Sequence, residues 1–204
     1  MVKKTIKESS KQVNAYLLKT SVQSFYRRQG CIVANEVTYG TGYIADVIII
    51  NKEKKVIEIE TKVSKNDLVK LERKKESKHN SQLKEGITPV KYYYAFGKKT
   101  IDSEKSISDY VPDYFYFCVP SNLVVEAIKF CKEVNPKYGV IEFKENEKNI
   151  YKSLIIKRKA VNLLDNCNKE KQYIYFKERV LNRLSNEITS IYYNQFWKSY
   201  CKKT

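Results

Sequence analysis

Histidine is almost absent from this sequence, since His79 is the one histidine among 204 residues. A nucleophilic triad built on histidine would have to use that residue, and a Cys/His zinc site would need cysteines from distant segments. The five cysteines are widely scattered, with no Cys-x-x-Cys pair and an odd total. The sequence therefore disfavours both kinds of site and indicates a reducing compartment.

Long apolar runs are also missing. No run approaches the roughly 20 apolar residues of a membrane span, and the N-terminal segment has no apolar stretch of signal-peptide length. Internal repeats and low-complexity linkers are absent as well. We therefore expect a soluble protein in the cytoplasm, without a membrane partner.

Acidic residues are outnumbered, with 23 Asp and Glu against 39 Lys and Arg, which gives a formal net charge of +16. Such a charge attracts polyanions and makes association sensitive to salt, so nucleic acid is the natural partner. Lys, Asn, Ile and Tyr are abundant while Ala and Gly are scarce, a bias typical of AT-rich coding sequences. Because that bias raises the lysine content by itself, the charge only supports the inference.

Residues 43–62, YIADVIIINKEKKVIEIETK, are typical of a β-hairpin. Asp46 opens an apolar run to Ile50, the polar residues 51–54 supply the turn, and a second strand follows. Side chains alternate between the two faces of a strand. One face of the second strand therefore carries Val56, Glu58, Glu60 and Lys62, and the other carries Ile57, Ile59, Thr61 and Val63. We expect the isoleucine face to lie in the core.

The hairpin brings one acid, Asp46, towards the acid and lysine of Glu60-x-Lys62. Cross-strand partners lie roughly 5 Å apart at Cβ, so two carboxylates could meet beside an ammonium group. Carboxylate oxygens suit Mg²⁺ or Mn²⁺, and an ammonium group stabilises negative charge on a phosphorus centre. Glu36, on the preceding strand, could join them or simply be exposed. The alternative for the whole face is a solvated surface with weak ion pairs, and spacing alone does not choose between the two.

The remaining segments predict a mixed α/β fold of one elaborated domain. The expected helices cover Ser9 or Ser10 to about Gln29, Leu68 to about Leu83, Ser121 to about Glu133, and about Lys169 to Tyr200. The expected strands are 31–39, the two of the hairpin, 114–119, 138–143 and 151–157, the last two forming an edge hairpin. Residues 84–112 are interpreted as an insertion or lid, whose tyrosines could stack on bases or pack in a strand.

Two of the predicted helices carry distinctive surfaces. Lys70, Lys74 and Lys78 follow one another at intervals of four residues, with His79 beside them, and this strip could bind phosphates. A solvated helix face balanced by neighbouring glutamates is the alternative. The last helix, about 169–200, has an apolar stripe that should pack on the body, and a homodimer contact through it is possible.

The order helix, three antiparallel strands, helix, strand resembles the PD-(D/E)xK nuclease superfamily, with Asp46 on the second strand and Glu60-Thr61-Lys62 on the third. The match to the MmcB-like DNA-repair nuclease branch covers about residues 12–145 and rests on further segments: Val63 to Leu68, Lys78-His79, Asp113 to Pro120 and Tyr138 to Ile141. The sequence departs from the family at Ala45, which replaces the familiar proline, and in the longer segment at about 84–112. The insertion leaves the substrate preference open.

The resemblance implies a restriction-endonuclease-like core in residues 1–167, with residues 168–204 as a helical extension packed on it. It implies that Asp46 and Glu60 bind Mg²⁺ or Mn²⁺, that the Thr61 carbonyl adds a ligand, and that Lys62 positions or activates the attacking water. Glu36 would be an outer acid, and Lys78 and His79 would contact substrate phosphates.

The expected function is therefore metal-dependent hydrolysis of DNA, in repair, recombination or phage DNA processing. Two alternatives stay open, a DNA-binding scaffold that does not cleave and an RNA-processing nuclease with the same site.

Overall fold

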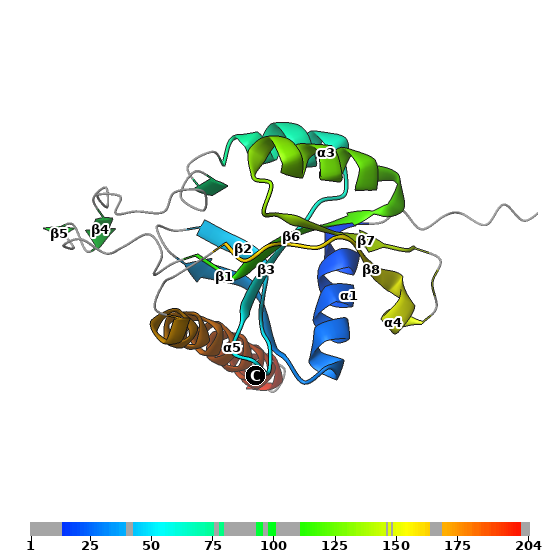
Figure 1. The fold of residues 1–204 in the computed structure, drawn as a ribbon. Coiled ribbons are helices and arrows are strands. Elements are labelled where there is room, and N and C mark those ends of the chain that lie inside the picture. The colour runs from blue at the N-terminus through cyan, green and yellow to red at the C-terminus, as the bar shows by residue number, and fades with distance from the viewer. Residues whose placement is uncertain are drawn as a thin grey trace, which may run out of the picture.

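A six-stranded sheet in the order β1-β2-β3-β6-β7-β8 forms the centre of the molecule (Figure 1). This computed structural model describes residues 14–39, 43–75, 78–79, 93–95, 98–100, 111–145, 147, 149–163 and 169–200. The strands are β1 (Ile32–Tyr39), β2 (Tyr43–Ile50), β3 (Val56–Thr61), β6 (Tyr114–Pro120), β7 (Gly139–Phe143) and β8 (Leu154–Arg158). Neighbours pair antiparallel from β1 to β3, parallel from β3 to β7, and antiparallel between β7 and β8. The expectation of a mixed α/β fold with an edge hairpin is confirmed.

The helices are α1 (Ala15–Arg28), the π-helical turn η1 (Asn66–Leu71), the 3₁₀ turn η3 (Ser121–Leu123), α3 (Val124–Val134), α4 (Ile150–Ser153) and α5 (Lys169–Tyr200). Two short strands, β4 (Tyr93–Ala95) and β5 (Lys98–Thr100), pair with each other in a separate sheet. They lie in the predicted insertion, residues 84–112, most of which lies outside the described residues. None of the described helices is long and apolar enough to span a membrane.

Capping chemistry sets several element boundaries. The side chain of Asn14 accepts a hydrogen bond from the Leu17 amide at 2.8 Å, so α1 begins at Ala15. The predicted starts at Ser9 and Ser10 lie outside the described residues. At the other end Gly30 has φ 78°, the left-handed conformation that suits a helix C-terminus. Ser64 Oγ accepts from the Asp67 amide at 3.1 Å, as its place in a capping-box variant predicts.

Two predicted elements differ from the structure. The predicted strand 151–157 begins only at Leu154, because the amides of Lys152 and Ser153 donate to the Asn149 carbonyl and close the turn of α4. The predicted helix at 68–83 is a π-helical turn that starts at Asn66, and its regular helical bonding gives way to turns at residues 74–75. Residues 80–92 lie outside the described part of the chain.

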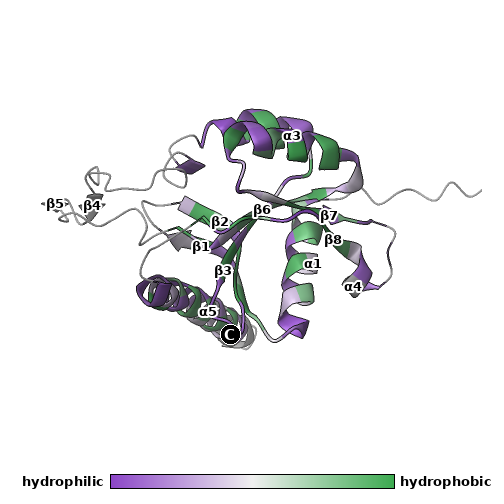
Figure 2. Cartoon of the chain, in the orientation of Figure 1, coloured by the Kyte–Doolittle hydropathy of each residue, from purple (hydrophilic) through white to green (hydrophobic). Residues whose placement is uncertain are grey.

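Hydrophobic clusters cover both faces of the sheet. Helix α1 packs with Leu18 and Val22 against Val47 and Ile59, so the predicted isoleucine face of β3 does lie in the core. On the other face α3 covers β6 and β7, and α5 packs on β1 and β2 through Phe176. Figure 2 shows hydrophobic and hydrophilic residues mixed around α3 and α5, as expected for helices with one packed side.

Candidate functional site

The charged face of β3 is buried. Glu58 and Glu60 pair in register with Phe115 and Phe117 of β6, which belong to the cluster under α3. Strand alternation places Lys62 on this same side, and all three side chains are nearly inaccessible to solvent. The sequence-based alternative of a solvated strand face is therefore wrong for these residues.

Segment 66–79, of which the structure describes residues 66–75 and 78–79, covers this face and supplies the counter-charges. We call the resulting set the buried ionic cluster: Glu58, Glu60, Lys62, Glu72, Lys75, Lys78 and His79. Three glutamates face three lysines, and the partly exposed Asp67 adds a further carboxylate 3.5 Å from Lys62. Charges this deeply buried are tolerated only when they are paired.

Lys78 stands between the two glutamates of β3. Its Nζ lies 2.5 Å from Glu58 Oε1 and 2.7 Å from Glu60 Oε1, and 1% of the residue is exposed. Burial by itself lowers the pKa of Lys78, but the two carboxylates outweigh that effect and raise it, so the side chain stays charged. Tyr39 donates its hydroxyl to Glu58 Oε2 at 2.6 Å and completes the shell of that carboxylate.

Glu72 holds Lys62. The Lys62 ammonium lies 2.6 Å from Glu72 Oε2 and 3.6 Å from Glu60 Oε2. His79 Nε2 lies 3.2 Å from Glu72 Oε1, and its Nδ1 lies 2.9 Å from the Tyr138 hydroxyl. Burial would raise the pKa of Glu72, but His79 and Lys62 together hold it well below its usual range. Lys62 is thereby fixed as a protonated ammonium group, since its own pKa is raised by Glu72 and Glu60 against the effect of burial.

Asp46 faces the opposite side of the sheet. Its Oδ1 lies 2.9 Å from Lys19 Nζ of α1, while its Oδ2 accepts from both the amide and the hydroxyl of Thr61 at 2.8 Å. Burial raises the pKa of Asp46, but the bonds from Lys19 and Thr61 outweigh it and lower the pKa overall. Asp46 thus touches the residue between Glu60 and Lys62 rather than their side chains.

A local irregularity explains this orientation. Val33 and Val47 belong to the cluster under α1, whereas Val37 and Ala45 belong to the cluster under α5. Regular alternation would put Val33 and Val37 on one face, so the strands twist between them, where Glu36 has φ 53°. Glu36 is largely exposed and lies 3.5 Å from Lys19 and 3.4 Å from Arg183.

Of the four residues predicted to form a phosphate-binding strip, two are exposed and two are buried. Lys70 and Lys74 are exposed, as a role in nucleic-acid binding requires. Lys78 and His79 are buried inside the ionic cluster, where they contact glutamates, so neither is on the surface where the expected contact with substrate phosphates would be made. The helix that would have aligned the strip breaks at residues 74–75.

Sequence reasoning missed that Glu72 and Lys75 belong to the site, together with the tyrosines that bond to it. Residues 72, 75 and 79 are spaced by three and four, which places Glu72, Lys75 and His79 on one side of a helical segment. The signal available in the sequence was this side of the helical segment, whose charges alternate in sign and can face those of Glu58, Glu60 and Lys62. Tyr39 and Tyr138 come from distant segments, and nothing in the local pattern points to them.

The predicted metal ligands have the chemistry of a site for a divalent cation. Asp46, Glu60 and the Thr61 carbonyl are hard oxygen ligands of the kind Mg²⁺ prefers, and ammonium groups already stand beside both carboxylates: Lys19 by Asp46 and Lys75, at 3.0 Å, by Glu60. The donor chemistry therefore fits a cation. Within the described ranges, however, no group of three or more His, Cys, Asp or Glu side chains is assembled to hold one.

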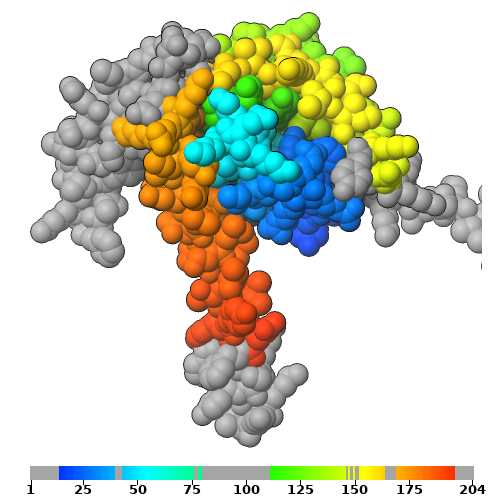
Figure 3. All heavy atoms as spheres, turned by 60° about the horizontal axis from the view of Figure 1, so that its bottom comes forward, coloured from blue at the N-terminus to red at the C-terminus, as the bar shows by residue number. Residues whose placement is uncertain are grey.

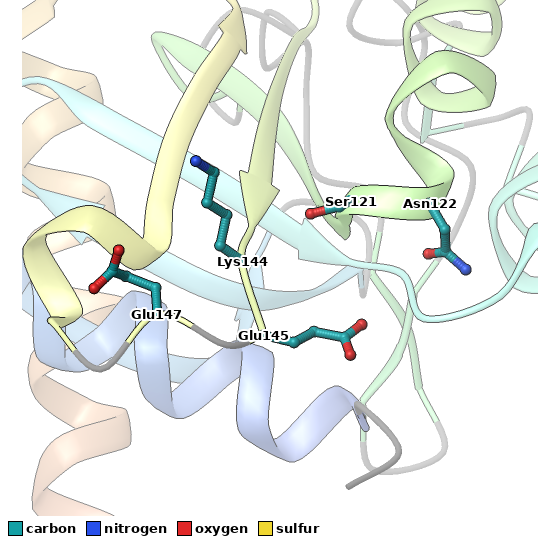
Figure 4. Close-up of a pocket in the computed structure, with 5 residues that line it drawn as sticks. All are labelled: Ser121, Asn122, Lys144, Glu145 and Glu147. Carbon is teal, nitrogen blue, oxygen red and sulfur yellow. The ribbon is translucent and has the colours of Figure 1, made fainter. Parts of the chain in front are cut away.

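A surface cavity of about 590 Å³ lies where β6 and β7 end (Figure 4). It is lined by Ser121, Asn122, Lys144, Glu145 and Glu147. None of the predicted site residues lines it, and four of its five lining residues are exposed. The cavity therefore adds no chemistry to the ionic cluster.

Comparison with known proteins shows a similarity in fold. No protein-family model matches the sequence, and no curated protein matches it. A solved structure of a protein of unknown function from Silicibacter pomeroyi superposes with a TM-score of 0.53 and 12% sequence identity, over 85% of this chain and 88% of that one. The similarity extends over most of both chains and concerns the fold alone.

Proposed function

We propose that this protein is a Mg²⁺- or Mn²⁺-dependent nuclease with a restriction-endonuclease-like core, and that it hydrolyses phosphodiester bonds in DNA. The observation that carries the proposal is the meeting of three motif positions at the end of β3. Glu60 and Lys62 lie 3.6 Å apart at their charged atoms, and Asp46 bonds to Thr61 between them. The net charge of +16 and the exposed Lys70 and Lys74 favour a polyanionic substrate.

For Asp46, Glu60 and the Thr61 carbonyl to hold one metal ion, the Asp46 carboxylate would have to turn from Lys19 and Thr61 towards the face of Glu60. The ion would then supply an activated water for attack on phosphorus. Lys62 acts as a fixed positive charge rather than as a base, because its pKa is raised and Glu72 holds its ammonium group. Such a charge stabilises the negative charge that develops on the phosphate. Two lysines contact Glu60, and Lys75 is the one that can move away from it, because 39% of its side chain is exposed whereas Lys78 is buried.

The experiment is cleavage of labelled linear, circular, single-stranded and branched DNA, with matched RNA, in the presence of Mg²⁺ or Mn²⁺. Glu60→Gln and Lys62→Met should each slow cleavage by about 10²–10³-fold, as expected for losing one preorganised electrostatic group. Lys132→Met is the matched control, because Lys132 is exposed on α3 and belongs neither to the site nor to the strip of Lys70 and Lys74. Circular dichroism must show that the slow variants remain folded. A Glu60→Gln protein that cuts as fast as the parent would remove the assignment.

A DNA-binding scaffold without cleavage is the second candidate, and one observation favours it. Both oxygens of Glu60 already face lysines, Oε1 at Lys78 and Oε2 at Lys75. Titration calorimetry separates the candidates. Binding of DNA without uptake of Mg²⁺ or Mn²⁺ at millimolar metal, together with no cleavage of any substrate, supports the scaffold.

A further inference from the structure

The second half of α5 stands clear of the body. Its first half is anchored by Phe176 and Val180, which are buried against β1 and β2. From Ser185 to Gln195 every residue except Glu187 is exposed. Figure 3 shows this part of the helix extending away from the rest of the described chain.

An apolar stripe continues along α5 beyond the part of the helix that packs on the sheet. Leu181, Ile188, Ile191 and Tyr192 are 47, 55, 55 and 68% exposed. Leu181 and Ile188 are seven residues apart, as are Leu184 and Ile191, the spacing of the a and d positions in a helix pair. The stripe is therefore patterned for another helix.

The overhang, residues 185–200, is poorly suited to stand alone. It holds 16 residues, close to the length at which isolated helices are marginal in water. Its sequence, SNEITSIYYNQFWKSY, is rich in serine, tyrosine, isoleucine and asparagine, which form helices less readily than alanine or leucine. Packing on a partner would supply the missing stability.

The charge of the overhang indicates which partner. Glu187 and Lys198 are the charged residues of the overhang, and their charges cancel. The net charge of +16 is therefore carried by the rest of the chain. A phosphate backbone finds no excess of positive charge there. Two copies of this chain, each with a net charge of +16, repel each other overall, and a neutral surface is where this repulsion opposes contact least.

We propose that the overhang pairs with the overhang of a second copy of this chain, in an antiparallel helix pair to which Ile188 and Ile191 contribute. The antiparallel arrangement keeps the two positively charged bodies at opposite ends of the pair. At about 1.5 Å per residue the 16-residue overhang is about 24 Å long. The pair is isologous, so the same stripe contributes from both copies.

The test measures the mass of the intact protein by sedimentation equilibrium between about 1 and 100 µM. The parent should sediment as a dimer, and association should strengthen from about 0.15 to 1 M NaCl because salt screens the repulsion between the bodies. Ile188→Glu combined with Ile191→Glu should give a monomer. Far-ultraviolet circular dichroism should show that the body of this variant remains folded. Asn186→Glu, on the opposite side of the helix, should remain dimeric.

Small-angle scattering should show an elongated dimer with two separated masses. A monomer at about 100 µM, or a double variant that dimerises like the parent, would overturn the proposal. So would a monomer that binds anionic lipid vesicles through Ile188 and Ile191, since the stripe would then face a membrane surface.

Discussion

Replacement of Lys78 by methionine tests the account of the buried ionic cluster. Lys78 neutralises Glu58 and Glu60 at 2.5 and 2.7 Å in a site almost closed to solvent. Methionine keeps much of the side-chain volume but leaves two buried carboxylates without their shared cation. Breaking a buried pair in this way typically costs about 3–5 kcal/mol, a large part of the roughly 5–15 kcal/mol that stabilises a domain.

The loss should depend on pH. Burial already raises the pKa of Glu58, and removing Lys78 takes away the strongest interaction that lowers it. A carboxyl group whose pKa is higher in the folded than in the unfolded state binds more protons when folded, so it destabilises the fold as pH rises above about 4.3, the unfolded value. Lys78 itself stays protonated across this range because its pKa is raised. The free energy lost by Lys78→Met should therefore be larger at pH 8 than at pH 5.

Urea unfolding followed by circular dichroism gives the free energies at both pH values. Lys75→Met serves as the control, because Lys75 contacts Glu60 and Glu72 but its side chain is 39% exposed, and solvent screening limits its expected cost to about 1 kcal/mol. Lys78→Met combined with Glu58→Gln should recover part of the loss. A Lys78→Met protein within about 1 kcal/mol of the parent at pH 8 would refute the reasoning.

Two further predictions concern other buried groups. Tyr39→Phe removes the hydroxyl that donates to Glu58 at 2.6 Å and should cost about 1.5–3 kcal/mol, read from the urea midpoint; an unchanged midpoint would mean that the bond contributes nothing. Cys118 is buried and its pKa is raised to about 12, so thiol reagents at pH 8 should modify it only after unfolding, as peptide mapping can show. Modification of Cys118 in the folded protein as fast as of the partly exposed Cys31 would contradict this.

Much of the fold was accessible from local patterns. The unbroken run of aromatic and other apolar residues at 114–119 predicts β6, and the long helical pattern from Lys169 predicts α5 to its final residue. The polar turn at 51–54 was predicted as well, and Asn51 closes it by accepting from the amides of Glu53 and Lys55. These elements share one property, namely that the deciding interactions lie within a few residues of each other.

The candidate site was less accessible, because periodicity shows which residues share a face but not what covers that face. Glu58, Glu60 and Lys62 were correctly placed together, but their burial depends on segment 66–79 folding back over β3. The orientation of Asp46 depends on the twist beside Glu36, a non-glycine residue at φ 53° that no local pattern predicts.

The parallel pairing of β3 with β6 has a consequence for how the chain folds. Strands β1, β2 and β3 can pair through short turns, whereas β6 adds to β3 only after residues 62–113 have formed a closed loop between Thr61 and Tyr114. Contacts so distant in sequence slow folding, so the antiparallel meander should form first. Loop-closure entropy grows slowly, at about 0.6 kcal/mol for each doubling of loop length. The segment that precedes β6 can thus lengthen or shorten at little thermodynamic cost while the register of the sheet stays the same.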